Sequence, residues 1–503
     1  MNNTLRNVGK SKSNLADLEN QMSSEKKITR PSDDPIIAIR ALSLRSTLNE
    51  INMYLETNVP AANAWLELTD TSLENMDSVI QDVYKYCVQG ASDQFNESDR
   101  SSIIEVLKQY KNEIYSQANA SNAGRYIFTG FKTDTSFTFL TDADANKKYE
   151  IEQNFTGADL IKGQLMLRSV DVPADASGLR TIGAADTPEG IDVYKYRLAY
   201  NDLESTGFAT SITSYNYDDS GAISGLKFSK SVVSISEADL EAQLSAAGGY
   251  DTFAQNTTTV YYVYDTGELV IPDAQYEDFK DSKDLSFTYQ KDGFLAGDPR
   301  PEMYFNCKDI TDPSNVIEYN LDEDGQEISF TVNFSQTLRV NTLGSETISY
   351  DIGRDIDDMC NALLKVEEVE DTISKLEKMK ESPTYSSEDA QTKLDSMIEA
   401  AKKELDYATE NMKSLFSQEM TRVTAYQDKI DIQISDLGAR MTRLNLTRSR
   451  LTEQKTTFTD LKSKNEDVEL EDTVIKYSSA STLYEAALTA ASRTVKQSLL
   501  DYI

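Results

Sequence analysis

Helix-breaking residues are concentrated in the middle of this 503-residue chain and are scarce towards both ends. Of the 21 glycines and 10 prolines, 15 and 6 respectively fall between residues 131 and 352. Long helices are therefore possible in the flanks but not in the middle, because proline removes a backbone donor and glycine adds conformational freedom. The distribution predicts an α+β fold: a long helical-bundle or coiled-coil stem built from both chain ends, with an inserted β-rich antiparallel middle domain.

Both flanks carry the helical period. Ser32, Asp33, Asp34 and Pro35 offer capping oxygens followed by a proline at a first-turn position, which predicts a helix start. Apolar residues then recur at three-and-four spacing in two seams, and Pro60 predicts a kink or restart near residue 59. The seams comprise Trp65, Leu68, Ser72, Met76, Val79, Val83 and Tyr86, with Leu66, Leu73, Ile80 and Cys87.

The middle region has the alternation of a half-buried strand. Apolar and polar side chains alternate over residues 328–334, as expected where one face of a sheet is buried. A hairpin is predicted at Asp265, Thr266 and Gly267, between two apolar runs, because glycine accepts the positive φ angles of tight turns. Asp324 and Gly325 predict a second turn.

The two chain ends carry apolar stripes with no nearby element to cover them. Two alternatives remain open: the stripes cover each other in an intramolecular coiled coil, or they are assembly interfaces with neighbouring subunits. The candidate self-assembly residues are Leu5, Val8, Leu15, Leu18 and Met22 at the start, and Tyr484, Leu488, Ala491, Val495 and Leu499 at the end.

Composition excludes several classes of function. With 84 acidic and 50 basic side chains the net charge is −34, which opposes nucleic-acid binding. The chain has no histidine, so imidazole-based triads, dyads and metal sites are impossible. The three cysteines are isolated and give neither a disulfide framework nor a metal pattern. We therefore expect no enzyme activity, no cofactor and no metal, and neither nucleic acid nor a membrane as a partner.

The N-terminal block resembles the flagellin superfamily. Residues 18–28 lead into Arg30-Pro31-Ser32-Asp33-Asp34-Pro35, a form typical of the family of type 3 hook-associated proteins at the hook–filament junction. Residues 118–130 and the ending 497–503 support the resemblance. The family usually has a glycine after Ser23 and Ser24, at a glycine-dependent turn, whereas this chain has Glu25.

The resemblance implies a structural subunit without enzyme activity, acting as an adaptor at the hook–filament junction and polymerising through its terminal helices. It also implies export by the flagellar type III apparatus without a cleaved signal peptide, an extracellular place in the bacterial flagellum, and assembly as a homo-oligomeric ring. The implied partners are the other hook-associated junction protein, flagellin and a flagellar export chaperone. Two alternatives stay open: a filament flagellin, and a flagellar surface protein whose tyrosine-rich middle domain binds a glycan or host ligand.

The predicted organisation has five segments. They are an N-terminal assembly helix (1–34), the first half of the helical stem (35–130), a β-rich outer domain with possible subdomains (131–352), the second half of the stem (353–460) and a C-terminal assembly helix (461–503).

Overall fold

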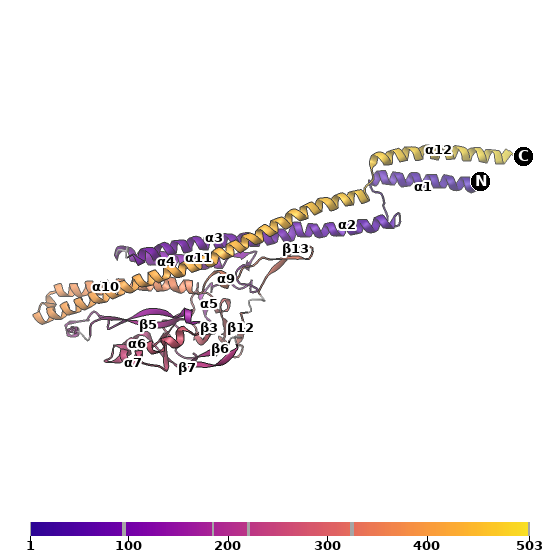
Figure 1. Ribbon diagram of the computed structural model, residues 1–503. Helices are drawn as coiled ribbons and strands as arrows, with labels where there is room; N and C mark the ends of the chain where they lie inside the picture. Colours follow the sequence, from indigo (N-terminus) through magenta and orange to yellow (C-terminus); the bar gives the residue numbers. More distant parts are fainter. Residues whose placement is uncertain (1, 93–96, 184–185, 219–221, 322–325, 501–503) are drawn as a thin grey trace. The chain divides into compact units, whose positions relative to one another are not determined.

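The computed structural model describes residues 2–92, 97–183, 186–218, 222–321 and 326–500 (Figure 1). Long helices occupy both flanks and the strands lie between them, which confirms the predicted α+β fold. The chain forms two compact units: residues 1–64, 329–339 and 439–503 make unit 1, and residues 65–328 and 340–438 make unit 2. No described helix is both long and apolar enough to cross a membrane.

The long helices follow the period seen in the sequence. They are α1 (Asn2–Ser24), α2 (Pro35–Met53), α3 (Val59–Ala91), α4 (Glu97–Ala118), α10 (Asp351–Glu381), α11 (Glu388–Glu466) and α12 (Leu470–Leu500). Short helices are α5 (Asp142–Ala145), α6 (Glu237–Ser245), α7 (Gly249–Ala254), α8 (Tyr276–Lys280) and α9 (Gly344–Thr347). A π-helical turn, Tyr54–Asn58, joins α2 to α3. The N–H of Val59 donates to the carbonyl of Tyr54 and Pro60 follows directly, so the helical backbone is irregular where a kink or restart was predicted.

The strands of unit 2 form two main sheets. One has the order β4-β5-β9-β8-β7-β6 and the other the order β10-β3-β11-β12. The six-stranded sheet contains β4 (Ile161–Leu167), β5 (Glu189–Arg197), β6 (Ser211–Tyr217), β7 (Ile223–Ile235), β8 (Thr259–Val263) and β9 (Glu268–Ile271). The four-stranded sheet contains β3 (Tyr149–Phe155), β10 (Leu285–Lys291), β11 (Asn306–Asp309) and β12 (Ile317–Tyr319). A two-stranded ribbon, β1 (Ser121–Asn122) with β2 (Arg125–Tyr126), precedes them.

The expected hairpin is present between β8 and β9, where Gly267 has φ +66°. The expectation of a mostly antiparallel middle needs one addition, because β7 and β8 pair in parallel. Helices α6 and α7 supply the crossover that such a pair requires. The predicted strand near residue 330 is β13 (Ser329–Asn333), which pairs with β14 (Gln336–Arg339) in unit 1. Asp324 and Gly325 lie outside the described residues.

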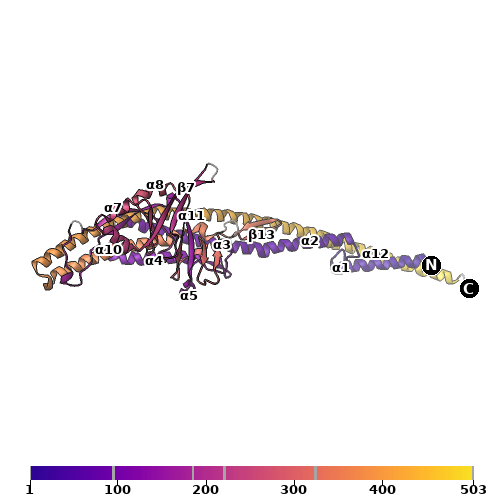
Figure 2. The same ribbon diagram turned by 90° about the horizontal axis from the view of Figure 1, so that it is seen from below.

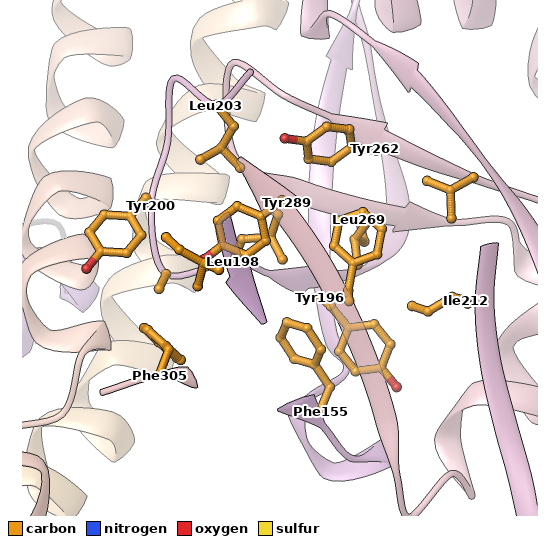
Figure 3. Packing of buried hydrophobic residues seen from close by; sticks show 14 of the residues in the cluster. Phe155, Tyr196, Leu198, Tyr200, Leu203, Ile212, Tyr262, Leu269, Tyr289 and Phe305 are labelled. Carbon is orange, nitrogen blue, oxygen red and sulfur yellow. The ribbon is translucent and has the colours of Figure 1, made fainter. Parts of the chain in front are cut away.

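One hydrophobic core of unit 2 is formed by residues of both main sheets. Aromatic side chains from both sheets share one cluster, in which Phe155 and Tyr289 of the smaller sheet lie near Tyr196 and Tyr262 of the larger (Figure 3). The other face of the larger sheet packs against Leu240, Leu244 and Phe253 of α6 and α7. A sheet covered on both faces explains why this region supports so many buried tyrosines.

A buried charge network joins β5 to α10 and α11 within unit 2. Arg197 bonds Asp351 and Asp358 and pairs with Asp355, whose carboxylate also accepts bonds from Arg422 and Tyr426. Asp355 is 1% exposed, so these partners provide the hydrogen bonds that burial would otherwise remove.

Candidate functional site

The two chain ends form one helix pair in unit 1. Helices α1 and α12 lie side by side, with both termini at the same end of the pair (Figures 1 and 2). Val8, Leu15, Leu18 and Met22 of α1 are half-buried, as are Tyr484 and Ala491 of α12. The structure thus brings together the inner members of both predicted stripes.

The remaining predicted stripe residues are less covered. Leu5 is 58% exposed and Leu488 is 43% exposed. Val495 and Leu499 lie in α12, but their side chains are outside the described part of the structure. Among the described side chains, no residue of α1 is fully buried. In α12, Thr473 is the one fully buried residue among them. The pair therefore buries little apolar surface for its length, and burial is the main source of helical stability in proteins.

Large apolar side chains are also exposed on α12 and on α2, the helix that follows α1. On α12, Ile475 is 65% exposed and Leu483 is 66% exposed. On α2, Ile36, Ile39 and Leu42 are each about two-thirds exposed and recur every three residues. Single exposed leucines are ordinary in proteins, whereas a row of large exposed apolar side chains along one helix is typical of interaction surfaces.

The connectors between the stem and the terminal pair are joined to each other. The N–H of Lys27 donates to the carbonyl of Glu466 at 2.7 Å, and the N–H of Val468 donates to the carbonyl of Glu25 at 3.1 Å. Glu25 has φ +57°, so this chain makes a left-handed turn with glutamate at the position where the family usually has glycine. Residues that carry a Cβ atom pay a steric cost in that region, which asparagine and aspartate tolerate best.

Four charged side chains pair across the same two connectors, and we call Lys26, Arg45, Glu466 and Asp467 the connector clamp. Arg45 binds Glu466 through two bonds, Nε to Oε1 at 2.8 Å and Nη2 to Oε2 at 2.7 Å. Lys26 pairs with Asp467 and lies 4.0 Å from Glu466. The Glu466 side chain is only 4% exposed. The bond from Lys26 lowers the pKa of Asp467, and the bond to Glu466 raises the pKa of Arg45, as expected for paired charges.

The predicted helix cap divides into distinct roles. Asp34 is the N-cap of α2, and its Oδ1 accepts bonds from the N–H groups of Ile36 and Ile37. Asp33 instead accepts bonds from the backbone N–H groups of Arg30 and Thr29, and these lower its pKa. Ser32 is exposed and caps nothing, and Pro35 is the first residue of α2.

Sequence reasoning missed the connector clamp. Its two bonded pairs join residues 421 and 441 positions apart. The sequence offered one signal for these pairs, namely opposite charges close to two predicted helix ends. A chain with 134 charged residues contains many such pairs of opposite charge, so this signal could not single out the clamp. In the described residues no group of three or more Cys, Asp or Glu side chains could hold a metal.

Comparison with known proteins identifies the terminal regions. Residues 1–133 match the bacterial flagellin N-terminal helical region and residues 420–503 match the bacterial flagellin C-terminal helical region. Both ends of the chain are therefore similar to the helical regions of bacterial flagellin. The resemblance seen in the N-terminal block is thereby confirmed. The first matched region contains α1 and the second contains α12.

Two curated relatives of this chain are named flagellar hook-associated protein 3. The one from Salmonella typhimurium is 25% identical over 48% of this chain and 76% of its own length. The one from Escherichia coli is 29% identical over 23% of this chain and 37% of its own length. The match to the crystal structure of flagellar hook associated protein-3 from Legionella pneumophila covers 84% of this chain and 97% of that chain, at 13% identity and with a TM-score of 0.32. The prediction of a structural flagellar subunit of the hook–filament junction is confirmed by the curated relatives and the terminal regions.

Proposed function

We propose that this subunit joins its neighbours at the hook–filament junction through the α1–α12 pair. The observation that carries the proposal is the incomplete burial of that pair: its inner residues are half-buried while Leu5, Ile475 and Leu483 remain mostly exposed. Neighbouring copies would cover these side chains, each contributing roughly 1.5–3 kcal/mol when fully buried. The two alternatives from the sequence, an intramolecular coiled coil and an assembly interface, are then successive states of the same helices. The α1–α12 pair is weak in the free chain and is covered by neighbouring subunits in the assembly.

We infer a homo-oligomeric ring whose partners are the other hook-associated junction protein and flagellin, with an export chaperone before assembly. Export through the flagellar type III apparatus would place the protein outside the cell, and the net charge of −34 would keep it soluble before assembly. We keep the predicted division of the chain into terminal assembly helices, two stem halves and an outer domain at 131–352 as part of this proposal.

We also infer that the chain performs no catalysis and takes no cofactor. With no histidine, cysteine is the remaining common nucleophile to consider. Burial raises the pKa of Cys87 to about 12 and that of Cys360 to about 11, and Cys307 is also buried with a raised pKa. Buried thiols of this kind stay protonated at neutral pH and are chemically inert.

Electron microscopy of a strain lacking this protein tests the proposal. We expect hooks without filaments, since the adaptor between hook and flagellin would be missing. Complementation with the parent chain should restore filaments, whereas Leu15→Asp and Leu488→Asp should not. Full-length filaments in the deletion strain would contradict the proposed role.

A further inference from the structure

A row of large apolar side chains runs along the exposed face of α2, and we call it the α2 row. It consists of Ile36, Ile39 and Leu42, which lie three residues apart and are each about two-thirds exposed. The row is about 9 Å long, since a helix rises about 1.5 Å per residue. The other side of α2 is already covered, because Ala41 and Ile51 are buried there. The α2 row is therefore a ridge with no partner among the described residues of its own chain.

The outer face of α12, directed away from α1, carries two adjacent rows with a spacing of four residues. All six side chains are exposed, and the rows are Ile475, Ser479 and Leu483, and Val474, Ser478 and Thr482. Ridges with a spacing of three residues on one helix pack into the grooves between ridges with a spacing of four on another, at a crossing angle of about 20°. The small side chains in the middle of these rows let a ridge approach closely. The α2 row and the outer face of α12 are therefore complementary in spacing.

The charges beside the two surfaces are opposite. Arg40 lies within the span of the α2 row, is exposed, and forms no ion pair with any residue that the structure describes. Glu471 and Glu485 flank the two rows of α12, are also exposed, and are equally unpaired within the described chain. Copies with a net charge of −34 repel each other, so a contact between them needs opposite charges locally. Arg40 facing one of these glutamates meets that requirement.

The two surfaces suit neighbouring copies of the chain. Helix α12 lies against α1 of its own chain through its inner side chains, which leaves its outer face open to another copy (Figure 1). In a ring each subunit contacts the next head to tail, so it needs two different complementary patches rather than one self-complementary patch. The α2 row and the outer face of α12 are two such patches, and both belong to unit 1.

We propose that the α2 row of one subunit binds the outer face of α12 in the next subunit. The three apolar side chains of α2 pack between the two rows of α12, and Arg40 pairs with Glu471 or Glu485, according to the direction in which the helices run. This inference rests on the proposed assembly role and names the surface that the terminal pair contacts on its neighbour.

Disulfide trapping in assembled flagella tests the contact. A deletion strain expresses two full-length chains with different epitope tags, one carrying Ile39→Cys and the other Ser479→Cys. The three native cysteines are buried and should not react. After mild oxidation of flagella detached with their hooks, we expect a dimer that carries both tags. Ser229→Cys in place of Ser479→Cys is the matched control, because Ser229 is also exposed but lies on β7 of unit 2, and should give about tenfold less dimer or none.

Charge exchange tests the same contact without cysteines. Arg40→Glu should lower the number of filaments per cell about tenfold or more, because like charges would then face each other across the interface. Combining Arg40→Glu with Glu471→Arg or with Glu485→Arg should restore filaments in one of the two cases. The combination that restores them gives the relative direction of the two helices. Circular dichroism of the secreted variants separates lost assembly from lost folding.

Three results would overturn the proposal. They are filaments that yield no doubly tagged dimer, dimers that carry a single tag and so join two identical surfaces, and a folded Arg40→Glu chain that neither charge combination rescues. These failures differ from a failure of the assembly role itself, which normal filaments from a secreted Ile475→Asp chain would show. Loss of filaments in Ile475→Asp together with no doubly tagged dimer in the cysteine strain would keep the assembly role and reject the α2 row as its partner.

Discussion

Breaking the connector clamp from its two sides should have unequal effects. Arg45→Met removes both bonds to a carboxylate that is 4% exposed, whereas Glu466→Gln leaves an arginine side chain that is 53% exposed. Water can solvate the arginine but not the carboxylate. The arginine substitution should therefore be the more damaging, although both remove the same pair.

The expected magnitudes follow from this burial. An unpaired buried carboxylate costs about 2–3 kcal/mol, reduced here only slightly because Lys26 remains 4.0 Å away. Glutamine at position 466 keeps one acceptor, so Glu466→Gln should cost about 1 kcal/mol. Since 1.4 kcal/mol is a factor of ten, these values correspond to roughly 30–150-fold and about 5-fold more frequent opening of the connectors.

Hydrogen exchange on the purified chain measures this opening locally. Peptides covering residues 25–34 and 464–470 should exchange faster in both variants and fastest in Arg45→Met, while β-sheet peptides of unit 2 stay unchanged. Asp460→Asn is the matched control, because it breaks an exposed pair with Lys464 within one helix and should change exchange by less than two-fold. Equal exchange in the two clamp variants, or no change in either, would refute the claim that the buried Glu466 carboxylate depends on Arg45.

Three further predictions follow from single residues. Glu25→Gly should stabilise the turn between α1 and α2 by roughly 1 kcal/mol, because glycine adopts φ +57° without the steric cost, and slower proteolysis of residues 25–34 would show it. Asp34→Ala should cost about 0.5–2 kcal/mol of α2 stability by removing its cap, while Ser32→Ala should cost almost nothing; exchange of the first turn of α2 distinguishes them. Glu419→Gln should make the free energy of unfolding less dependent on pH, because burial raises the pKa of Glu419 to about 9. The folded parent therefore holds a proton that the unfolded chain releases, and it loses stability as pH rises from about 4.5 to 9, by at most about 1.4 kcal/mol per pH unit. Thermal melts of the two proteins between pH 5 and 9 should diverge in favour of the glutamine variant, and parallel curves would contradict a neutral Glu419.

The sequence was informative where structure depends on local signals. The cap at Asp34, the irregular helical turn beside Pro60 and the hairpin at Gly267 each involve residues within a few positions of one another, and short-range spacing specifies them. The parallel pairing of β7 with β8 was missed because a strand run carries no information about the direction of its neighbour.

The site was harder to predict because its contacts join distant residues. Helical period placed Leu488 in a stripe, yet the partner helix leaves it 43% exposed, since exposure depends on what lies beside α12. Arg45 and Glu466 lie on separate helices at opposite ends of the sequence, and only the meeting of the chain ends makes them partners.

The central claim, assembly through the outer surface of the terminal pair, is tested most directly by Ile475→Asp. Ile475 is 65% exposed, so the charge should leave the free chain intact but penalise contact with a neighbour at every position of the ring. Electron microscopy of a complemented deletion strain, with the secreted variant checked for parent-like hydrogen exchange, is the decisive measurement. The account predicts hooks without filaments for Ile475→Asp and normal filaments for the size-conserving Ile475→Leu; normal filaments from a secreted Ile475→Asp chain would contradict it.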